Sequence, residues 1–476
     1  MQPQPARRLN GRSGSGLRCR LQALSVLAAL GCLCWPTMGA AQMVGPTPQP
    51  QGTPVTPEQA AQTPQQNWAV HGQATITWQL QPAFRAPYSG PQSLIPNANG
   101  RETIDTTLYA GIRPWPGGEI WLNPEIDQGF GLSDTFGVAG YPSGEAYKVG
   151  KADPYVLVQR GFLRQTINLG GESEKLAPDL NQLGGTQTAN RLVFTIGKYS
   201  VVDIFDTNSY AHDPRNDFMN WSIIDQGAFD YAANSWGYSY GGAVEWYQDW
   251  WTFRTGVYDL SAEPNSDGLS PNLAQLQFVT ELEERHHLWQ QPGKLKFLYW
   301  LSRGNLGTYL DAISLGEAVG QAPSTAGVRT LRTKDGVGLN FEQQIAADLG
   351  VFARASLSQG TVEEVDFTDI NQSISAGLSL TGSRWGRPDD TVGLAGAANR
   401  ISHQGKLYLA AGGLGGIIGD GQLPNAGPEQ ILEAYYRVAV LSFAHFAFDY
   451  QFINNPAYNR DRGPVSIFAL QLHLQY

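Results

Sequence analysis

Cysteine is almost missing from this chain. Its 476 residues include only three, Cys19, Cys32 and Cys34, and all three lie in an N-terminal region that we expect to be removed. A mature chain without cysteine has no disulfide framework and no thiolate ligand for a metal. The sequence therefore predicts neither a disulfide scaffold nor a cysteine-bound metal, and we expect no cofactor.

Long apolar runs are also scarce. The longest, Leu21 to Trp35, follows five arginines and precedes Gly39-Ala40-Ala41. Its 15 residues fall short of the roughly 20 that cross a bilayer as a helix, which disfavours the alternative of a membrane anchor. We predict that residues 1–41 are a Sec-type signal peptide, cleaved after Ala41. No later run approaches a spanning helix, so any membrane-spanning part must be built from β-strands.

Positive charge is in short supply. The chain has a formal net charge of −10, and the predicted leader holds five arginines and no acidic residue, so its removal leaves −15. Such an acidic chain is a poor partner for nucleic acid. We therefore exclude nucleic-acid binding.

Regular structure is expected only from Trp68 onward. Residues 42–67 are dominated by Pro, Gln and Thr, a composition that predicts a flexible periplasmic segment without regular structure. From Trp68 a two-residue alternation begins: Trp78 and Leu80 share one parity with other apolar residues, and Thr75 and Thr77 lie on the other. This pattern is typical of strands with one face in lipid and one in water.

The same alternation recurs in sixteen segments. They cover 68–80, 103–113, 118–127, 155–168, 191–198, 236–248, 250–259, 274–285, 294–303, 335–345, 349–359, 370–382, 391–399, 429–440, 443–453 and 464–476. Long and short connections alternate between them, as in an up-and-down outer-membrane barrel whose long loops face outward. We predict an all-β fold over residues 68–476, a 16-stranded antiparallel transmembrane barrel. Barrels of 16 strands leave an aqueous channel, which points to transport.

Two features at the periplasmic side stand out. The connection Gly170 to Asn190 is too long for that side, and has room for a short helix. The last segment keeps its alternation to the final residue, the aromatic Tyr476. We expect the strand ending at Tyr476 to be recognised by the barrel assembly machinery.

Parity assigns several charged residues to the lumen. Arg160 and Arg164 share a face in the segment 155–168, and Tyr155, Leu157, Gly161, Leu163 and Ile167 form the opposite face. An arginine on the lipid side near the midplane would cost about 2–4 kcal/mol, so both arginines should point inward. The same argument sends Arg113, Glu119 and Glu125 inward. The alternative is that these charges only solvate a polar lumen.

The longest connection, residues 199–235, is rich in charged and aromatic residues. It includes Asp206, Arg215 and Trp221. We expect it to fold inward and narrow the pore, since long loops with their own residue signature are often functional. The alternative is an external loop held by its own salt bridges.

Two further groups of residues suggest chemistry but predict none. Glu281 and Arg285 precede His286 and His287, and adjacent residues in a strand point to opposite faces, so a shared metal site is not expected. We interpret this group as rim and lumen charge. Residues 237–241 match the Gly-x-Ser-x-Gly elbow of hydrolases around Ser239, but the alternating β and α elements that this elbow requires are missing. We predict that the protein is not an enzyme.

Several segments together resemble the carbohydrate-selective porins of the OprB family, over essentially all of residues 68–476. The resemblance is carried by Asn123–Glu125, Gly129–Leu132, Arg191–Lys198, Asp203–Asp206, Ala211–Arg215, Phe218–Trp221, Glu281, Glu284, Arg285, Gly419–Gly421, Glu433–Tyr436, Asp449–Phe452, Asn455–Asn459 and Asp461–Pro464. One departure is the terminal Tyr476, where outer-membrane proteins more often carry Phe.

The resemblance implies a pore in a Gram-negative outer membrane that admits glucose and other small sugars by diffusion. It also implies a constriction of arginine, acidic and aromatic side chains. The expected constriction residues are Arg113, Arg160, Arg164, Glu119, Glu125, Asp206, Arg215, Trp221, Glu281 and Arg285. The expected partners are small sugars, outer-membrane lipid and lipopolysaccharide, with a monomer and a trimer both open.

Three alternatives were kept beside a sugar porin. The mature charge of −15 would also suit a general or cation-preferring porin. The many aromatic residues would suit a secreted β-rich adhesin that binds glycans. The third alternative is an outer-membrane hydrolase centred on Ser239.

Overall fold

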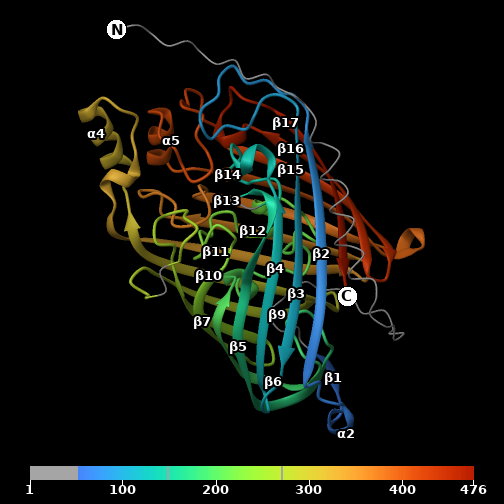
Figure 1. Cartoon of the computed structure of the whole chain (residues 1–476). Coiled ribbons are helices and arrows are strands. Elements are labelled where there is room, and N and C mark those ends of the chain that lie inside the picture. The colour runs from blue at the N-terminus through green and yellow to red at the C-terminus, as the bar shows by residue number, and fades with distance from the viewer. Residues whose placement is uncertain (1–51, 147–149, 270–271) are drawn as a thin grey trace. The chain divides into compact units, whose positions relative to one another are not determined.

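The structure is a computed structural model that describes residues 52–146, 150–269 and 272–476. The predicted signal peptide and cleavage site lie outside these residues. Within them, sixteen long strands form one antiparallel barrel (Figure 1). Each strand pairs with the next one along the chain, and β17 pairs with β2, which closes the barrel. The predicted closed barrel is confirmed.

The strands match the sixteen predicted segments one for one. Their bounds are β2 (Trp68–Gln81), β3 (Asn99–Ile112), β4 (Gly118–Gly129), β5 (Lys151–Leu176), β6 (Gly185–Tyr199), β7 (Ser239–Tyr247), β8 (Trp251–Asp259), β9 (Leu276–Leu288), β10 (Gln291–Leu306), β11 (Thr330–Ala346), β12 (Leu349–Ser358), β13 (Gln372–Gly382), β14 (Arg387–Arg400), β15 (Glu429–Leu441), β16 (Ala444–Asn454) and β17 (Val465–Gln475).

Side-chain parity separates the two faces of the wall. In β17, Phe468 and Leu470 are exposed on the outside, whereas Gln471 and His473 are buried inside. A strand that alternates in this way suits an apolar outer band and a polar interior. The alternation was readable from the sequence because even the shortest of these sixteen strands, β7 and β8, have 9 residues.

One predicted face was wrong. The pairing of β4 with β5 shifts register between Asn123 and Pro124, whose partners are Arg160 and Val158. Gln159 is the extra residue of this bulge, and it is buried beside the buried Arg160. A bulge reverses the parity of the residues that precede it. Val156 and Val158 therefore face outward, and Tyr155 lies on the same inner side as Arg160 rather than opposite to it.

The prediction for the segment before the barrel also needs correction. Residues 52–67, expected to lack regular structure, contain the short strand β1 (Thr53–Val55) and the helix α2 (Pro57–Gln62). β1 pairs with β5. α2 begins with a capping box in which Thr56 and Gln59 bond each other's backbone, and with Pro57 in its first turn.

The long connection Gly170–Asn190 contains no helix. β5 runs on to Leu176 and β6 begins at Gly185, so most of this region is an extended hairpin. The short helix for which this connection has room is not formed, and strand residues occupy most of its length.

The outward-facing connections carry the remaining short elements. These are η1 (Leu132–Thr135), η2 (Val201–Asp203), α3 (Trp221–Ile224), α4 (Tyr309–Val319), η3 (Thr325–Val328), α5 (His403–Ala410) and η5 (Pro456–Tyr458), whereas η4 (Ser383–Trp385) forms a short turn between β13 and β14. Within the described ranges, no helix is long and apolar enough to cross a membrane.

The core lies inside the barrel, where loops pack against the wall. We call residues 200–238 loop L3 and residues 130–146 loop L2. The main cluster of buried apolar side chains joins Tyr141 of L2 and Phe205 of L3 to wall residues such as Tyr258 and Trp300. The prediction that the longest loop folds inward is therefore confirmed.

Candidate functional site

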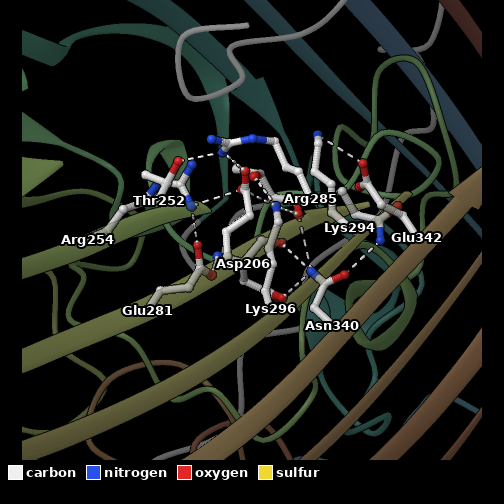
Figure 2. A network of polar contacts seen from close by, with 12 residues as sticks. Asp206, Thr252, Arg254, Glu281, Arg285, Lys294, Lys296, Asn340 and Glu342 are labelled. Atoms are coloured by element: carbon white, nitrogen blue, oxygen red, sulfur yellow. Dashed lines mark hydrogen bonds and ion pairs between the residues drawn. The ribbon is translucent and has the colours of Figure 1, made fainter. Parts of the chain in front are cut away.

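Loop L3 is attached to the inner wall of β9 to β12 through Asp206 (Figure 2). The backbone N–H of Asp206 donates to Glu281 Oε2 at 2.8 Å. Its carboxylate accepts from Arg354 Nε at 3.2 Å and from Asn340 Nδ2 at 2.7 Å. Asp206 is 0% exposed. It was predicted to line the constriction, but all of these contacts anchor L3.

Alternating acids and bases extend this attachment along β7 to β11. Arg254 forms ion pairs with Glu245 at 3.1 Å, Glu281 at 2.8 Å and Glu283 at 3.0 Å. Arg285 pairs with Glu283 at 2.7 Å. Figure 2 shows Arg254, Glu281 and Arg285 gathered around Asp206, together with Lys294, Lys296 and Glu342. We call this network the brace, because almost every charge in it is used by another protein group.

The middle of L3 is held by β15 and β16. Glu433 accepts hydrogen bonds from the backbone N–H groups of Met219, at 2.5 Å, and Asn220, at 3.1 Å. Asn220 Nδ2 also donates to Gln451 Oε1 at 3.0 Å. L3 is therefore fixed to two separate parts of the inner wall, near its start and at its middle.

A cavity of about 130 Å³ lies on the other side of L3, against β4 and β5. L3, L2 and the two strands all contribute side chains to it. The polar residues around it include Glu125, Arg160, Asp203 and Arg215. The space combines charged groups with aromatic rings.

The two arginines of the cavity are held by carboxylates. Arg160 donates from Nε and Nη2 to Asp203 at 2.7 and 2.6 Å, and its guanidinium lies 5.0 Å from the ring centre of Tyr238. Arg215 lies 3.3 Å from Glu145 Oε2 of L2. Burial raises the pKa of Glu145, and the nearby Arg215 opposes this shift. These ion pairs hold each guanidinium group at the cavity without occupying all of its N–H groups.

Aromatic rings supply the apolar side of the cavity. Trp221 stacks on Tyr141, with ring centroids 5.4 Å apart and planes inclined by 7°. Trp236 donates from Nε1 to the hydroxyl of Tyr155 at 2.9 Å. Flat ring faces beside hydrogen-bonding groups are what a sugar, with its apolar face and polar rim, can contact.

The predicted site residues fall into three places. Glu125, Arg160, Arg215 and Trp221 surround the cavity. Asp206, Glu281 and Arg285 belong to the brace. The remaining three meet at the end of the barrel where the short turns lie: Glu119 pairs with Arg113 at 3.1 Å and with Arg164 at 3.5 Å.

Several cavity residues were missed by the sequence reasoning. Tyr141 and Glu145 belong to L2, whose irregular sequence has no parity to indicate an inward direction. Tyr238 was considered only within the elbow motif around Ser239. Ser239 opens β7, and its hydroxyl donates to the carbonyl oxygen of Asp259 on the neighbouring β8. It therefore lies in a β-hairpin, unlike the serine of a hydrolase elbow.

Metal coordination is not apparent in this arrangement. Among the described residues, no group of three or more His, Cys, Asp or Glu side chains is arranged to hold a metal ion.

The closed 16-stranded barrel, with its longest loop folded into a polar lumen, defines the class of this protein as a porin. Residues 92–476 match the model of a family described as "Carbohydrate-selective porin, OprB family". The chain belongs to this family, as the sequence resemblance predicted, and it is an outer-membrane sugar porin. The general porin and the secreted adhesin are not favoured.

One solved structure shares this fold, and a second is less similar. A high-pH structure of OprB from Pseudomonas putida has a TM-score of 0.66 and 14% identity, covering 86% of this chain and 94% of that chain. The outer-membrane channel DcaP of Acinetobacter baumannii has a TM-score of 0.47 and 9% identity, covering 86% and 97%. No curated protein matches the chain in sequence.

Proposed function

We propose that small uncharged sugars diffuse passively along the inner face of β4 and β5, through the cavity beside L3. The observation that carries this proposal is the pairing of Arg160 and Arg215 with the rings of Trp221, Trp236 and Tyr238 around one space. On the brace side of L3, by contrast, the charged side chains contact one another.

The chemistry of the cavity suits a neutral polyol. A guanidinium offers several N–H donors in one plane, and a carboxylate accepts from hydroxyls. Arg160 and Arg215 are already paired with Asp203 and Glu145, which reduces the positive charge that either guanidinium offers to an anion. Each sugar contact is weak, and conduction requires binding that allows both entrance and release.

The same proposal covers the surroundings of the barrel. The exposed apolar residues of the outer wall, such as Trp78 and Phe468, would contact outer-membrane lipid, with lipopolysaccharide on the outer side. Residues 1–41 would direct export, and the strand ending at Tyr476 would engage the barrel assembly machinery. Sugar would cross unchanged, without a chemical reaction or energy coupling.

Liposome swelling with the purified protein tests the function. We expect glucose to enter faster than a neutral non-sugar solute of similar size. In planar bilayers, glucose should also reduce the ion current in a saturable way, since a bound sugar occupies the cavity. Equal entrance rates for the two solutes, together with an ion current that glucose does not affect, would refute the proposed selectivity.

A further inference from the structure

The hairpin between β5 and β6 extends past the end of the barrel wall. The last residue of β5 paired with β4 is Gln165, and the first residue of β6 paired with β7 is Arg191. We call residues 169–190, which lie beyond these pairs, the flap. By the rule that short turns face the periplasm, the flap stands at the periplasmic mouth.

The flap bends at two successive glycines. Gly170 and Gly171 have φ values of 107° and 88°, which residues with a side chain rarely adopt. The pairing of β5 with β6 shifts register on both sides of Gly170. Bulges of this kind bend a hairpin and increase its twist. Figure 1 shows β1 and α2 beside this end of the barrel.

The tip of the flap, residues 177–184, returns to the inner face of the wall. Asn123 Nδ2 of β4 donates to Asn181 Oδ1 at 2.9 Å, and Arg164 Nη1 of β5 donates to the carbonyl oxygen of Asn181 at 2.7 Å. Leu183 is 0% exposed and belongs to the same buried cluster as Trp121 and Phe162. The tip therefore lies within the mouth of the barrel.

The segment before the barrel fixes the flap in this position. Gln66 and Gly184 exchange two hydrogen bonds, at 3.0 Å from the N–H of Gln66 and at 2.8 Å to its side chain. Arg113 Nη1 donates to the carbonyl oxygens of Gln66 at 2.7 Å and Gly184 at 3.2 Å. β1 adds a third strand to the flap, with Thr53 opposite Lys175. The flap is thus held at its tip by Gln66 and Arg113, and along its β5 strand by β1.

The flap lies on the periplasmic side of the cavity, along the same part of the barrel wall. Arg160 borders the cavity and Arg164 contacts the flap tip, and four residues along a strand span about 13 Å. We propose that the flap is an exit constriction that limits the size of the sugars released to the periplasm. This inference rests on the proposed path along β4 and β5. The cavity beside L3 would then select by chemistry and the flap by size.

Removal of the flap tests this proposal. Asn168 and Arg191 are paired, so residues 169–190 can be replaced by Asn-Gly, which favours a two-residue hairpin turn. We expect the open-channel conductance to rise at least about twofold, and the flux of a trisaccharide to rise more than that of glucose. The glucose concentration that halves the current should stay unchanged. A matched control replaces residues 383–386, another periplasmic turn, by Asn-Gly.

A second variant keeps the barrel strands intact. Deletion of residues 44–64 removes β1 and α2 but leaves the flap, so we expect a noisier current and a smaller rise in trisaccharide flux. Heat-modifiable migration in detergent gels checks that each barrel has folded. Unchanged conductance and size dependence in the folded variants would overturn the exit constriction. Loss of glucose selectivity in the unmodified protein would instead overturn the proposed sugar path.

Discussion

The two sides of L3 use the same residue types for different purposes. On the brace side, Arg254 contacts three carboxylates and its side chain is 2% exposed. On the cavity side, Arg160 contacts one carboxylate and a tyrosine, and it borders open space. A buried arginine shared by three carboxylates holds a structure together, whereas one held by a single carboxylate at the edge of a cavity can bind a solute. The number of internal partners separates anchor from site.

Breaking the brace should have the largest effect. In Asp206→Ala, Arg354 and Asn340 lose their shared partner, and removal of one member of a buried ion pair typically costs about 3–5 kcal/mol. We expect a lower temperature for loss of the compact band in detergent gels, and a higher, unstable conductance as L3 moves. Asp348→Ala, at an exposed ion pair in a turn, is the control. If Asp206→Ala weakened glucose block without changing stability or conductance, Asp206 would be a sugar contact.

Substitutions on the cavity side should instead weaken sugar binding and leave the open conductance nearly unchanged. Arg160→Ala should weaken glucose block of the current about tenfold, which corresponds to about 1.4 kcal/mol, with little change in open conductance. Arg164→Ala should weaken it less, because Arg164 contacts Glu119 and the flap tip rather than the cavity. Titration of the current with glucose gives both values. An equal weakening of glucose block in the two variants would show that the sugar site lies closer to the periplasm than proposed.

A smaller effect should follow pH at the flap tip. Burial raises the pKa of Asp179 to about 7, although the N–H of Leu180 donates to its carboxylate and opposes the shift. Because this pKa is above that of the unfolded chain, the folded tip holds the proton more tightly. Its stability is therefore greatest near pH 4 and falls until about pH 7. Current noise should rise between pH 5 and 8, and Asp179→Asn should abolish that rise.

The smallest effect is expected at Ser239. Ser239→Ala removes one hydrogen bond to the Asp259 carbonyl group, a loss of about 1 kcal/mol in stability, and should leave glucose flux unchanged. Swelling assays beside the unmodified protein measure this. A marked fall in flux with a stable barrel would show that the β7 edge contributes to the path.

The sequence predicted the barrel well, since alternation over about ten residues repeats in all sixteen strands. The prediction from sequence failed where a local feature of the structure interrupted the expected pattern. The bulge at Gln159 reversed the parity of Tyr155, and no residue type announces such an insertion. Residues 52–67 have a composition typical of disorder, yet the free edge of β5 gives β1 its backbone partners.

The candidate site was predictable only in part. Parity correctly placed Arg160 and Glu125 inside the barrel, and the charged loop suggested Arg215 and Trp221, which also border the cavity. The sequence indicates only that a charged side chain can face the lumen. It therefore grouped Asp206, predicted from the charged loop, and Glu281 and Arg285, predicted as rim and lumen charge, with the cavity residues, although they belong to the brace. That distinction depends on contacts between L3 and strands far away in the sequence, which no local pattern encodes.

The bulge at Gln159 also sets the order in which a sugar would lose its water. Because of the extra residue, β5 presents Tyr155, bonded to Trp236, toward the outer end and Arg160 farther inside. A solute moving inward along the proposed path would first press its apolar face against the rings and shed loosely held water there. Its hydroxyls would exchange their tightly held water only afterwards, at the arginine. Dehydration would thus be divided into two small steps, which keeps each barrier low and transit fast.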